Sequence, residues 1–155
     1  MLNKHRDSPA LFAPKHYHLV AAGNEGLSPK FRVEILGEKT GKPSKRITLQ
    51  QRGIKIHSAV ISYKRKNIQY HHQVVRTNHI KSFDEVRIHT AENLYPGEYV
   101  INIYFTSKQP LSSYQNLSEQ GGKTIKDVDL RTYLPIFKVP ETNDTAQFKV
   151  SYTNE

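Results

Sequence analysis

The stretch Leu94–Phe105, with the sequence LYPGEYVINIYF, decides the fold class. Its segment Tyr95–Gly97 is typical of a turn, because proline fixes its own φ and glycine tolerates backbone conformations that other residues avoid. Large apolar side chains then occupy every second position, which is the period of a β-strand with one buried face. We therefore predict a strand whose core-facing side chains are those of Tyr99, Ile101, Ile103 and Phe105.

The same two-residue period extends toward the amino terminus, where β-branched and aromatic residues are enriched and strands are favoured over helices. A long strand from Ile54 to Tyr63 is expected to change its buried face near Ser58 and Ala59, as at a β-bulge. Lys64 to Asn67 would form the tip of the hairpin that follows this strand. The other expected strands contain Tyr17 and Leu19, then Phe31, Val33 and Ile35, then Ile47 and Leu49, then Ile68, Tyr70, His72 and Val74, and then Phe83 to His89 with Val86 and Ile88 on one face.

The period vanishes from Thr106 to Thr145, and it returns in a last strand from Ala146 to Tyr152. A long aperiodic stretch inside a compact domain is typical of a functional loop region or of short irregular elements. We predict an amino-terminal extension over residues 1–13 and one domain over residues 14–155. The fold class expected for this domain is all-β, an antiparallel β-sandwich.

The composition narrows the chemistry that the chain can support. Cysteine is absent, which excludes disulfides, thiolate metal sites and thiol nucleophiles. The first residues lack the apolar core of a secretory signal, and no later run is long enough to span a membrane. We therefore expect a soluble, cytoplasmic protein with no membrane partner.

A formal net charge of +9 raises the prospect of an anionic partner, such as nucleic acid or an acidic protein surface. The basic residues gather in two clusters beside turn-forming residues. The simpler interpretation is that both clusters are solvated loop tips, and the alternative is that they bind nucleic acid weakly. The first cluster is Lys39, Lys42, Lys45 and Arg46, and the second is Lys64, Arg65 and Lys66.

Four stretches, taken in order, resemble the amino-terminal domain of the aminopeptidase N family of zinc metallopeptidases. The motifs occur in the same order as in the family, and the resemblance extends over nearly the whole chain. The stretches are Pro14–Leu19 (PKHYHL), Arg46–Leu49 with Ile54–Val60, Leu94–Phe105, and Asp129–Pro135 (DLRTYLP) with Ala146–Val150.

The resemblance implies a saddle-like β-sandwich that packs on a thermolysin-like catalytic domain and closes one wall of its active site. The family's H-E-x-x-H zinc motif and its G-A-M-E-N strand are both missing from this sequence. Lys126 stands where the family has an acidic residue that binds the substrate's amino group, and Lys138–Pro140 replaces its D-E-P element. The resemblance therefore implies a non-catalytic module with no metal and no cofactor.

The histidines give little support to a metal site, because adjacent residues of a strand, such as His71 and His72, point to opposite faces. His79 and His89 lie in separate expected strands. We expect ordinary surface or half-buried histidines at these positions.

Three functions are compatible with these patterns. The first is a protein-binding or scaffolding module, and the second is the wall domain of an aminopeptidase whose catalytic part is on another chain or was removed. The third is a weak nucleic-acid binder. A docking surface is expected in the aperiodic stretch Thr106–Thr145 together with the strand Ala146–Tyr152. Its apolar-aromatic group must either pack inward or meet a partner, and this group is Arg131, Tyr133, Leu134, Pro135, Ile136 and Phe137. The candidate binding residues are Lys126, Asp127, Asp129, Arg131, Tyr133 and Phe137.

Overall fold

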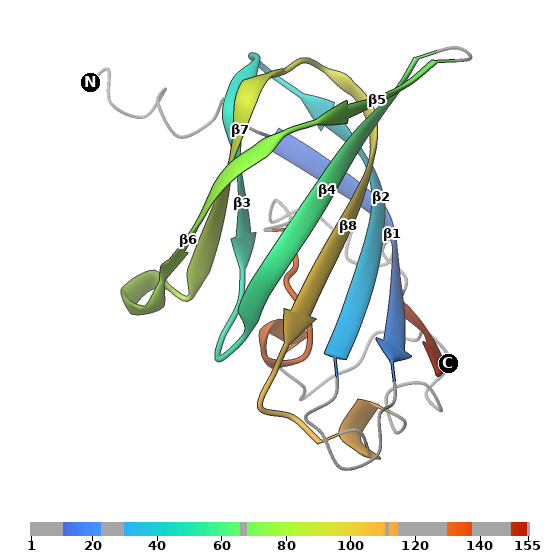
Figure 1. Cartoon of the computed structure of the whole chain (residues 1–155), viewed down its shortest axis with the longest axis vertical. Helices are drawn as coiled ribbons and strands as arrows, with labels where there is room; N and C mark the ends of the chain where they lie inside the picture. Colours follow the sequence, from blue (N-terminus) through green and yellow to red (C-terminus); the bar gives the residue numbers. More distant parts are fainter. Residues whose placement is uncertain are drawn as a thin grey trace.

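The computed structural model describes residues 11–22, 30–65, 68–110, 112–114, 130–137 and 150–154. These residues form strands and short 3-10 turns (Figure 1). The strands are β1 (Leu11–Ala22), β2 (Lys30–Thr40), β3 (Ser44–Gln50), β4 (Lys55–Arg65), β5 (Ile68–His72), β6 (Val74–Ile80), β7 (Glu85–Leu94), β8 (Gly97–Thr106) and β9 (Val150–Asn154). The 3-10 turns are η2 (Lys81–Phe83) and η3 (Leu130–Thr132).

The strands make two sheets of unequal size. The large sheet has the order β5-β4-β8-β2-β1-β9, and the small sheet has the order β3-β7-β6. Neighbouring strands are antiparallel throughout, except that β9 pairs with β1 in parallel at the edge of the large sheet. The predicted fold class, an all-β antiparallel sandwich, is confirmed.

The strand predicted from LYPGEYVINIYF is β8, which lies in the middle of the large sheet. Tyr99, Ile101, Ile103 and Phe105 are all buried, as predicted. Ile101 lies opposite Ile35 of β2 and Ile61 of β4, so three fully buried isoleucines form one row across three strands. Such cross-strand apolar rows are the main packing unit of a sheet, and they fix its register.

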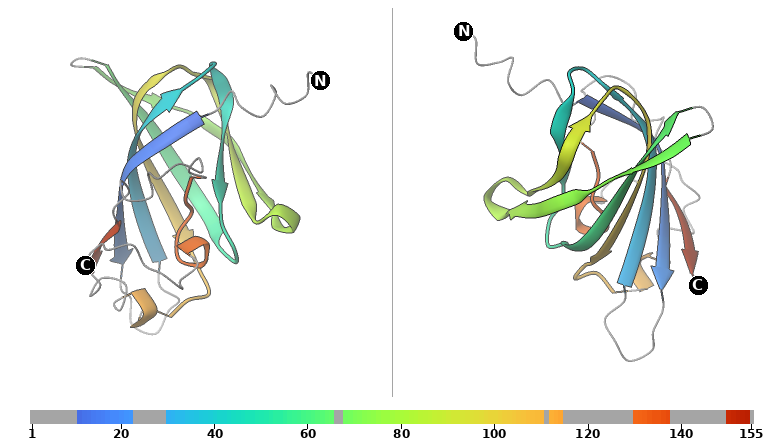
Figure 2. Two further views of the ribbon diagram at one scale, coloured as in Figure 1. Left: turned by 180° about the vertical axis from the view of Figure 1, so that it is seen from behind. Right: turned by 45° about the horizontal axis from the view of Figure 1, so that its top comes forward.

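Segment 130–137 lies against the inner face of the large sheet, where the small sheet does not reach (Figure 2). Leu134 is fully buried, and Phe137 is stacked on Phe12 of β1 with 4.2 Å between ring centroids. The backbone N–H of Phe137 donates to the hydroxyl of Tyr17 at 2.9 Å. Of the two alternatives for this apolar group, the structure favours inward packing.

The face switch predicted near Ser58 occurs at a β-bulge between Ile56 and Ser58. His57 and Ser58 are consequently both exposed, and the inward alternation resumes with Ala59, which lies opposite Ile103 and packs against the core. The hairpin tip predicted over Lys64 to Asn67 is wrong in its first half, because Lys64 and Arg65 belong to β4 and pair with Gln69 and Ile68, while residues 66–67 lie outside the described residues. The side chains of His57 and Ser58 at the bulge thus point away from the core, and the buried row of isoleucines is not disturbed.

Two strand boundaries were predicted wrongly. The strand expected to contain Ile68, Tyr70, His72 and Val74 is divided, because β5 ends at His72 in the large sheet and Val74 begins β6 in the small sheet. Phe83 was expected to begin a strand, but it lies in η2 with 65% of its surface exposed. Asp84 follows in the left-handed conformation with a φ of 54°, so the extended chain begins only at Glu85. At the two ends, β1 begins at Leu11 and β9 at Val150, while residues 146–149 of the expected last strand lie outside the described residues.

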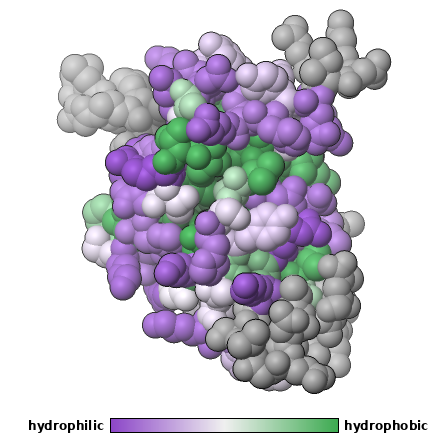
Figure 3. Space-filling model, in the orientation of Figure 1, coloured by the Kyte–Doolittle hydropathy of each residue, from purple (hydrophilic) through white to green (hydrophobic). Residues whose placement is uncertain are grey.

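Polar side chains cover most of the face seen in Figure 3, and apolar ones gather among them in its upper half. Exposed apolar residues on the strands of the large sheet include Leu36, Val60 and Tyr104. Tyr104 lies on β8 between the inward-facing Ile103 and Phe105, so it belongs to the outer face. The outer face is therefore mixed in character and differs clearly from the inner face, which is apolar except for Lys39 of β2.

Substitution of Ile101 by Asp is expected to unfold the domain. The variant would place an unpaired carboxylate in the centre of the core row, which costs about 4 kcal/mol or more. Thermal melting followed by circular dichroism tests this, with Tyr104→Asp on the exposed face of the same strand as the matched control. Equal melting of the two variants would mean that the inner and outer faces are assigned wrongly.

Candidate functional site

The structure describes only some of the candidate binding residues predicted from the sequence. Lys126, Asp127 and Asp129 lie outside the described residues. Arg131 and Tyr133 are half-buried, and Phe137 is in the core. The described residues of this group therefore form no continuous exposed surface. Phe137 is a core residue and is not available for docking.

Lys39 differs from the expectation of a solvated loop tip, because only 2% of its surface is exposed. It continues the inward alternation of β2, and its amine donates to the carbonyl oxygens of Thr40 and Lys42 in the following turn. Burial lowers the pKa of the Lys39 amine. This lysine therefore holds the β2–β3 turn and belongs to the structure of the sandwich.

The remaining basic residues of the two predicted clusters do not form one patch. Lys42, Lys45 and Lys64 are exposed and Arg46 is half-buried, while the side chain of Arg65 and all of Lys66 lie outside the described residues. The β2–β3 turn and the paired ends of β4 and β5 lie at the same end of the sandwich, and Figure 1 shows them on different sides of that end. Their charges are therefore presented to solvent separately.

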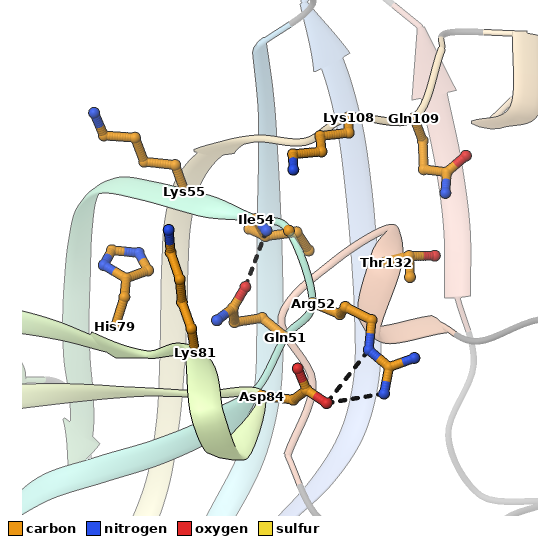
Figure 4. A pocket seen from close by; sticks show the side chains of 11 residues that line it. Gln51, Arg52, Ile54, Lys55, His79, Lys81, Asp84, Lys108, Gln109 and Thr132 are labelled. Atoms are coloured by element: carbon orange, nitrogen blue, oxygen red, sulfur yellow. Dashed lines mark hydrogen bonds and ion pairs between the residues drawn. The ribbon is translucent and has the colours of Figure 1, made fainter.

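A cleft of about 680 Å³ lies at the other end of the sandwich, where four connecting segments meet (Figure 4). They are the β3–β4 turn, η2 with the residue after it, the chain that follows β8, and η3. We call this the lysine cleft, after Lys55, Lys81 and Lys108 in its lining. The other lining residues are Gln51, Arg52, Gly53, Ile54, His79, Asp84, Gln109 and Thr132.

The floor of the lysine cleft is built by Gln51, a buried polar residue. Its amide nitrogen donates to the carbonyl oxygen of Glu85 at 3.1 Å, and its amide oxygen accepts the backbone N–H of Ile54 at 2.9 Å. Gly53 has a φ of 74°, which suits glycine, and the aliphatic stem of Lys108 passes over it. The two hydrogen bonds of Gln51 fix the β3–β4 turn, and the stem of Lys108 lies against that turn.

The charge of the lysine cleft is unbalanced. Asp84 is the only carboxylate among the described residues of its lining, and Arg52 already pairs with it at 2.8 Å while Arg131 lies 3.9 Å from the same oxygen. Among the described residues, no carboxylate comes within ion-pair distance of Lys55, Lys81 or Lys108. Such a concentration of unpaired positive charge attracts anions.

His79 lies beside these lysines and is held in its neutral form. Its Nε2 accepts the backbone N–H of Ile56 at 3.1 Å, next to the bulge of β4. Burial, followed by the charges of Lys55, His57 and Lys81, lowers the pKa of His79. Because Nε2 is the acceptor, the proton of the neutral ring is on Nδ1.

The lysine cleft was missed at the sequence level because its residues come from four separate turns. No spacing in the chain brings Lys55, Lys81 and Lys108 together, and each alone reads as a solvated surface lysine. Only the arrangement of the strand ends makes them neighbours.

The other histidines of the described part of the chain have separate surroundings. His71 contacts the hydroxyl of Ser62 at 2.8 Å, and His89 lies 3.4 Å from a guanidinium nitrogen of Arg76. Within that part no three His, Asp or Glu side chains are grouped as metal ligands. The same residues include no helix with the length and apolar character needed to cross a membrane.

The sequence matches no family model and no curated protein.

The domain is expected to lose stability as the pH falls below about 6.5, the ordinary pKa of histidine. The folded-state pKa values of His72, His79 and His89 are all lowered, chiefly by burial, so their contribution to stability is complete above 6.5 and is lost as the pH falls through the lowered values. Melting temperatures measured between about pH 7.5 and about pH 5 test this.

The variant His79→Gln should weaken this pH dependence, because glutamine can still accept the N–H of Ile56 but does not titrate. His72 and His89 keep the remainder. A His79→Gln variant with an unchanged slope would show that protonation of His79 is not linked to folding.

Proposed function

We propose that this chain is a non-catalytic binding module that docks an acidic segment of another protein in the lysine cleft. The single observation that carries the proposal is the group of three lysines without carboxylate partners among the described residues. A carboxylate-rich segment would neutralise them, and it would be steered to this end of the sandwich by the positive field.

The spread of the positive groups favours a polypeptide over a single small anion. Lys81 and Lys108 approach from different sides of the lysine cleft, and the amine of Lys55 points away from its centre (Figure 4). One small anion cannot contact all three amines, whereas successive carboxylates of an acidic segment can. The buried Ile54 and the aliphatic stem of Lys108 line the space between them.

The wall domain of a zinc aminopeptidase is the second candidate function. In the family that the sequence resembles, the late part of this domain faces the catalytic domain. Lys108, Gln109 and Thr132 come from that part of the chain and line the lysine cleft. The location of the cleft supports a catalytic chain as one possible source of the acidic segment.

Nucleic acid is the weaker alternative. Its phosphates would need a continuous basic surface, and the described lysines are divided between the β2–β3 turn, the β4–β5 hairpin and the lysine cleft. Affinity that is weak and falls linearly with log salt concentration is the expected behaviour toward DNA or RNA.

A glutamate-rich peptide is expected to bind the full chain, and the same peptide with glutamine in place of glutamate is not. The double variant Lys81→Gln, Lys108→Gln should weaken binding about tenfold or more, since loss of two charge contacts exceeds about 1.4 kcal/mol. Titration calorimetry at fixed ionic strength measures both affinities.

Lys64→Gln is the matched control, because Lys64 is an exposed lysine near the tip of the β4–β5 hairpin. It should leave the affinity unchanged. If Lys64→Gln weakens binding as much as the double variant, or if the glutamine peptide binds equally well, the lysine cleft is not a specific site for acidic segments.

A further inference from the structure

A second pocket, of about 460 Å³, lies at the end of the sandwich opposite the lysine cleft. The two pockets share no lining residue, and they flank the two ends of β8, with Tyr99 near its start and Lys108 just beyond its end. We call it the tyrosine pocket, because Tyr63, Tyr70, Tyr95 and Tyr99 line it.

Strand register brings three of these tyrosines together. Tyr70 of β5 lies opposite Tyr63 of β4, and Tyr63 lies opposite Tyr99 of β8. The rings of Tyr63 and Tyr99 are tilted with 4.9 Å between their centroids. Gly97 makes room for this arrangement, because a Cβ atom there would overlap the ring of Tyr63.

The outer part of the tyrosine pocket offers aromatic surface to solvent. Tyr70 is 48% exposed and Tyr95 is 57% exposed, whereas Tyr99 is buried and donates its hydroxyl proton to the carbonyl oxygen of Tyr95 at 2.6 Å. Burial, with Tyr63 nearby, raises the pKa of Tyr99 to about 12, so it remains protonated. The backbone under the exposed ring of Tyr95 is thereby held in place.

Polar groups of both kinds surround these rings. Glu92 accepts the hydroxyl proton of Tyr70 at 3.1 Å, and Lys45 and Asn93 complete the polar lining. The Nδ1 atom of His72 is buried without a hydrogen-bond partner in the described residues, although it lies at a pocket. Burial lowers the pKa of His72, which keeps the ring neutral near pH 7.

We propose that the tyrosine pocket binds a neutral saccharide, with pyranose rings lying on the exposed faces of Tyr70 and Tyr95. The apolar C–H faces of a sugar suit aromatic surface, and its hydroxyls both donate and accept hydrogen bonds. Glu92 accepts, Lys45 donates, and Asn93 does both.

The charges favour a neutral ligand over an ion. Lys45 and Glu92 carry opposite charges in one lining, so the pocket has no net charge when His72 is neutral. An organic cation would face Lys45, and an anion would face Glu92. Four tyrosines, which offer rigid amphipathic contact area at low entropic cost, suit a ligand that is apolar on its faces and polar on its edges.

The test uses the full chain labelled with ¹⁵N and three probes: maltohexaose, cellohexaose and chitohexaose. At least one should shift the amide signals of residues 91–95 and 69–72. Tyr95→Ala and Glu92→Gln should each weaken its binding about tenfold, since each removes more than about 1.4 kcal/mol of contact. Tyr104→Ala, an exposed tyrosine on the outer face, is the matched control and should leave the affinity unchanged.

Lys45→Gln separates a sugar from a cation. For a sugar the variant should bind more weakly or equally, because the ligand has no charge to be repelled by Lys45. Tetramethylammonium chloride and arginine amide are the cation probes. If either binds and Lys45→Gln strengthens that binding, the pocket is a cation site and the saccharide proposal is overturned. It is also overturned if none of the three oligosaccharides binds, or if Tyr104→Ala weakens binding as much as Tyr95→Ala.

Discussion

The two sheets of the sandwich are unequal, and the rest of the structure adjusts to that inequality. The small sheet has three strands and the large sheet has six, so the small sheet does not cover the inner face near β1 and β2. Tyr17, Leu19 and Phe31 point inward from these strands and would otherwise meet water. Segment 130–137 fills this space together with Tyr114, whose ring is stacked on Phe31 with 4.1 Å between ring centroids, and the two act as the missing part of the second layer.

The hold on this segment is specific at several points. Gln50 of β3 exchanges two backbone hydrogen bonds with Ile136, and the hydroxyl of Tyr114 donates to the carbonyl oxygen of Tyr133 at 2.7 Å. The backbone N–H of Arg52 donates to the carbonyl oxygen of Arg131. The guanidinium of Arg131 in turn lies 3.9 Å from a carboxylate oxygen of Asp84. The wall of the lysine cleft is therefore set by the same contacts that close the core, and its shape depends on both layers.

The sequence predicted what depends on local period and missed what depends on register and on the meeting of turns. The alternation in Tyr99–Phe105 needs only neighbouring residues to be recognised, and the structure confirms it. Lys39 follows the same alternation in β2, but its charge suggested an exposed position. The carbonyl oxygens that accept hydrogen bonds from its amine come together only in the folded turn, so the sequence alone does not reveal them. The tyrosine row requires the pairing of β5, β4 and β8, which no single strand encodes.

The hydrogen bond between Tyr17 and Phe137 joins residues 120 positions apart, and the parallel pairing of β1 with β9 joins ends that are still more distant. Contacts of such separation are slow to form, because loop closure must precede any gain from packing. During synthesis, the apolar inner face of β1 therefore stays without its cover until residues 130–137 have left the ribosome. During that interval the inner face of the first strand is exposed apolar surface of the kind that promotes aggregation.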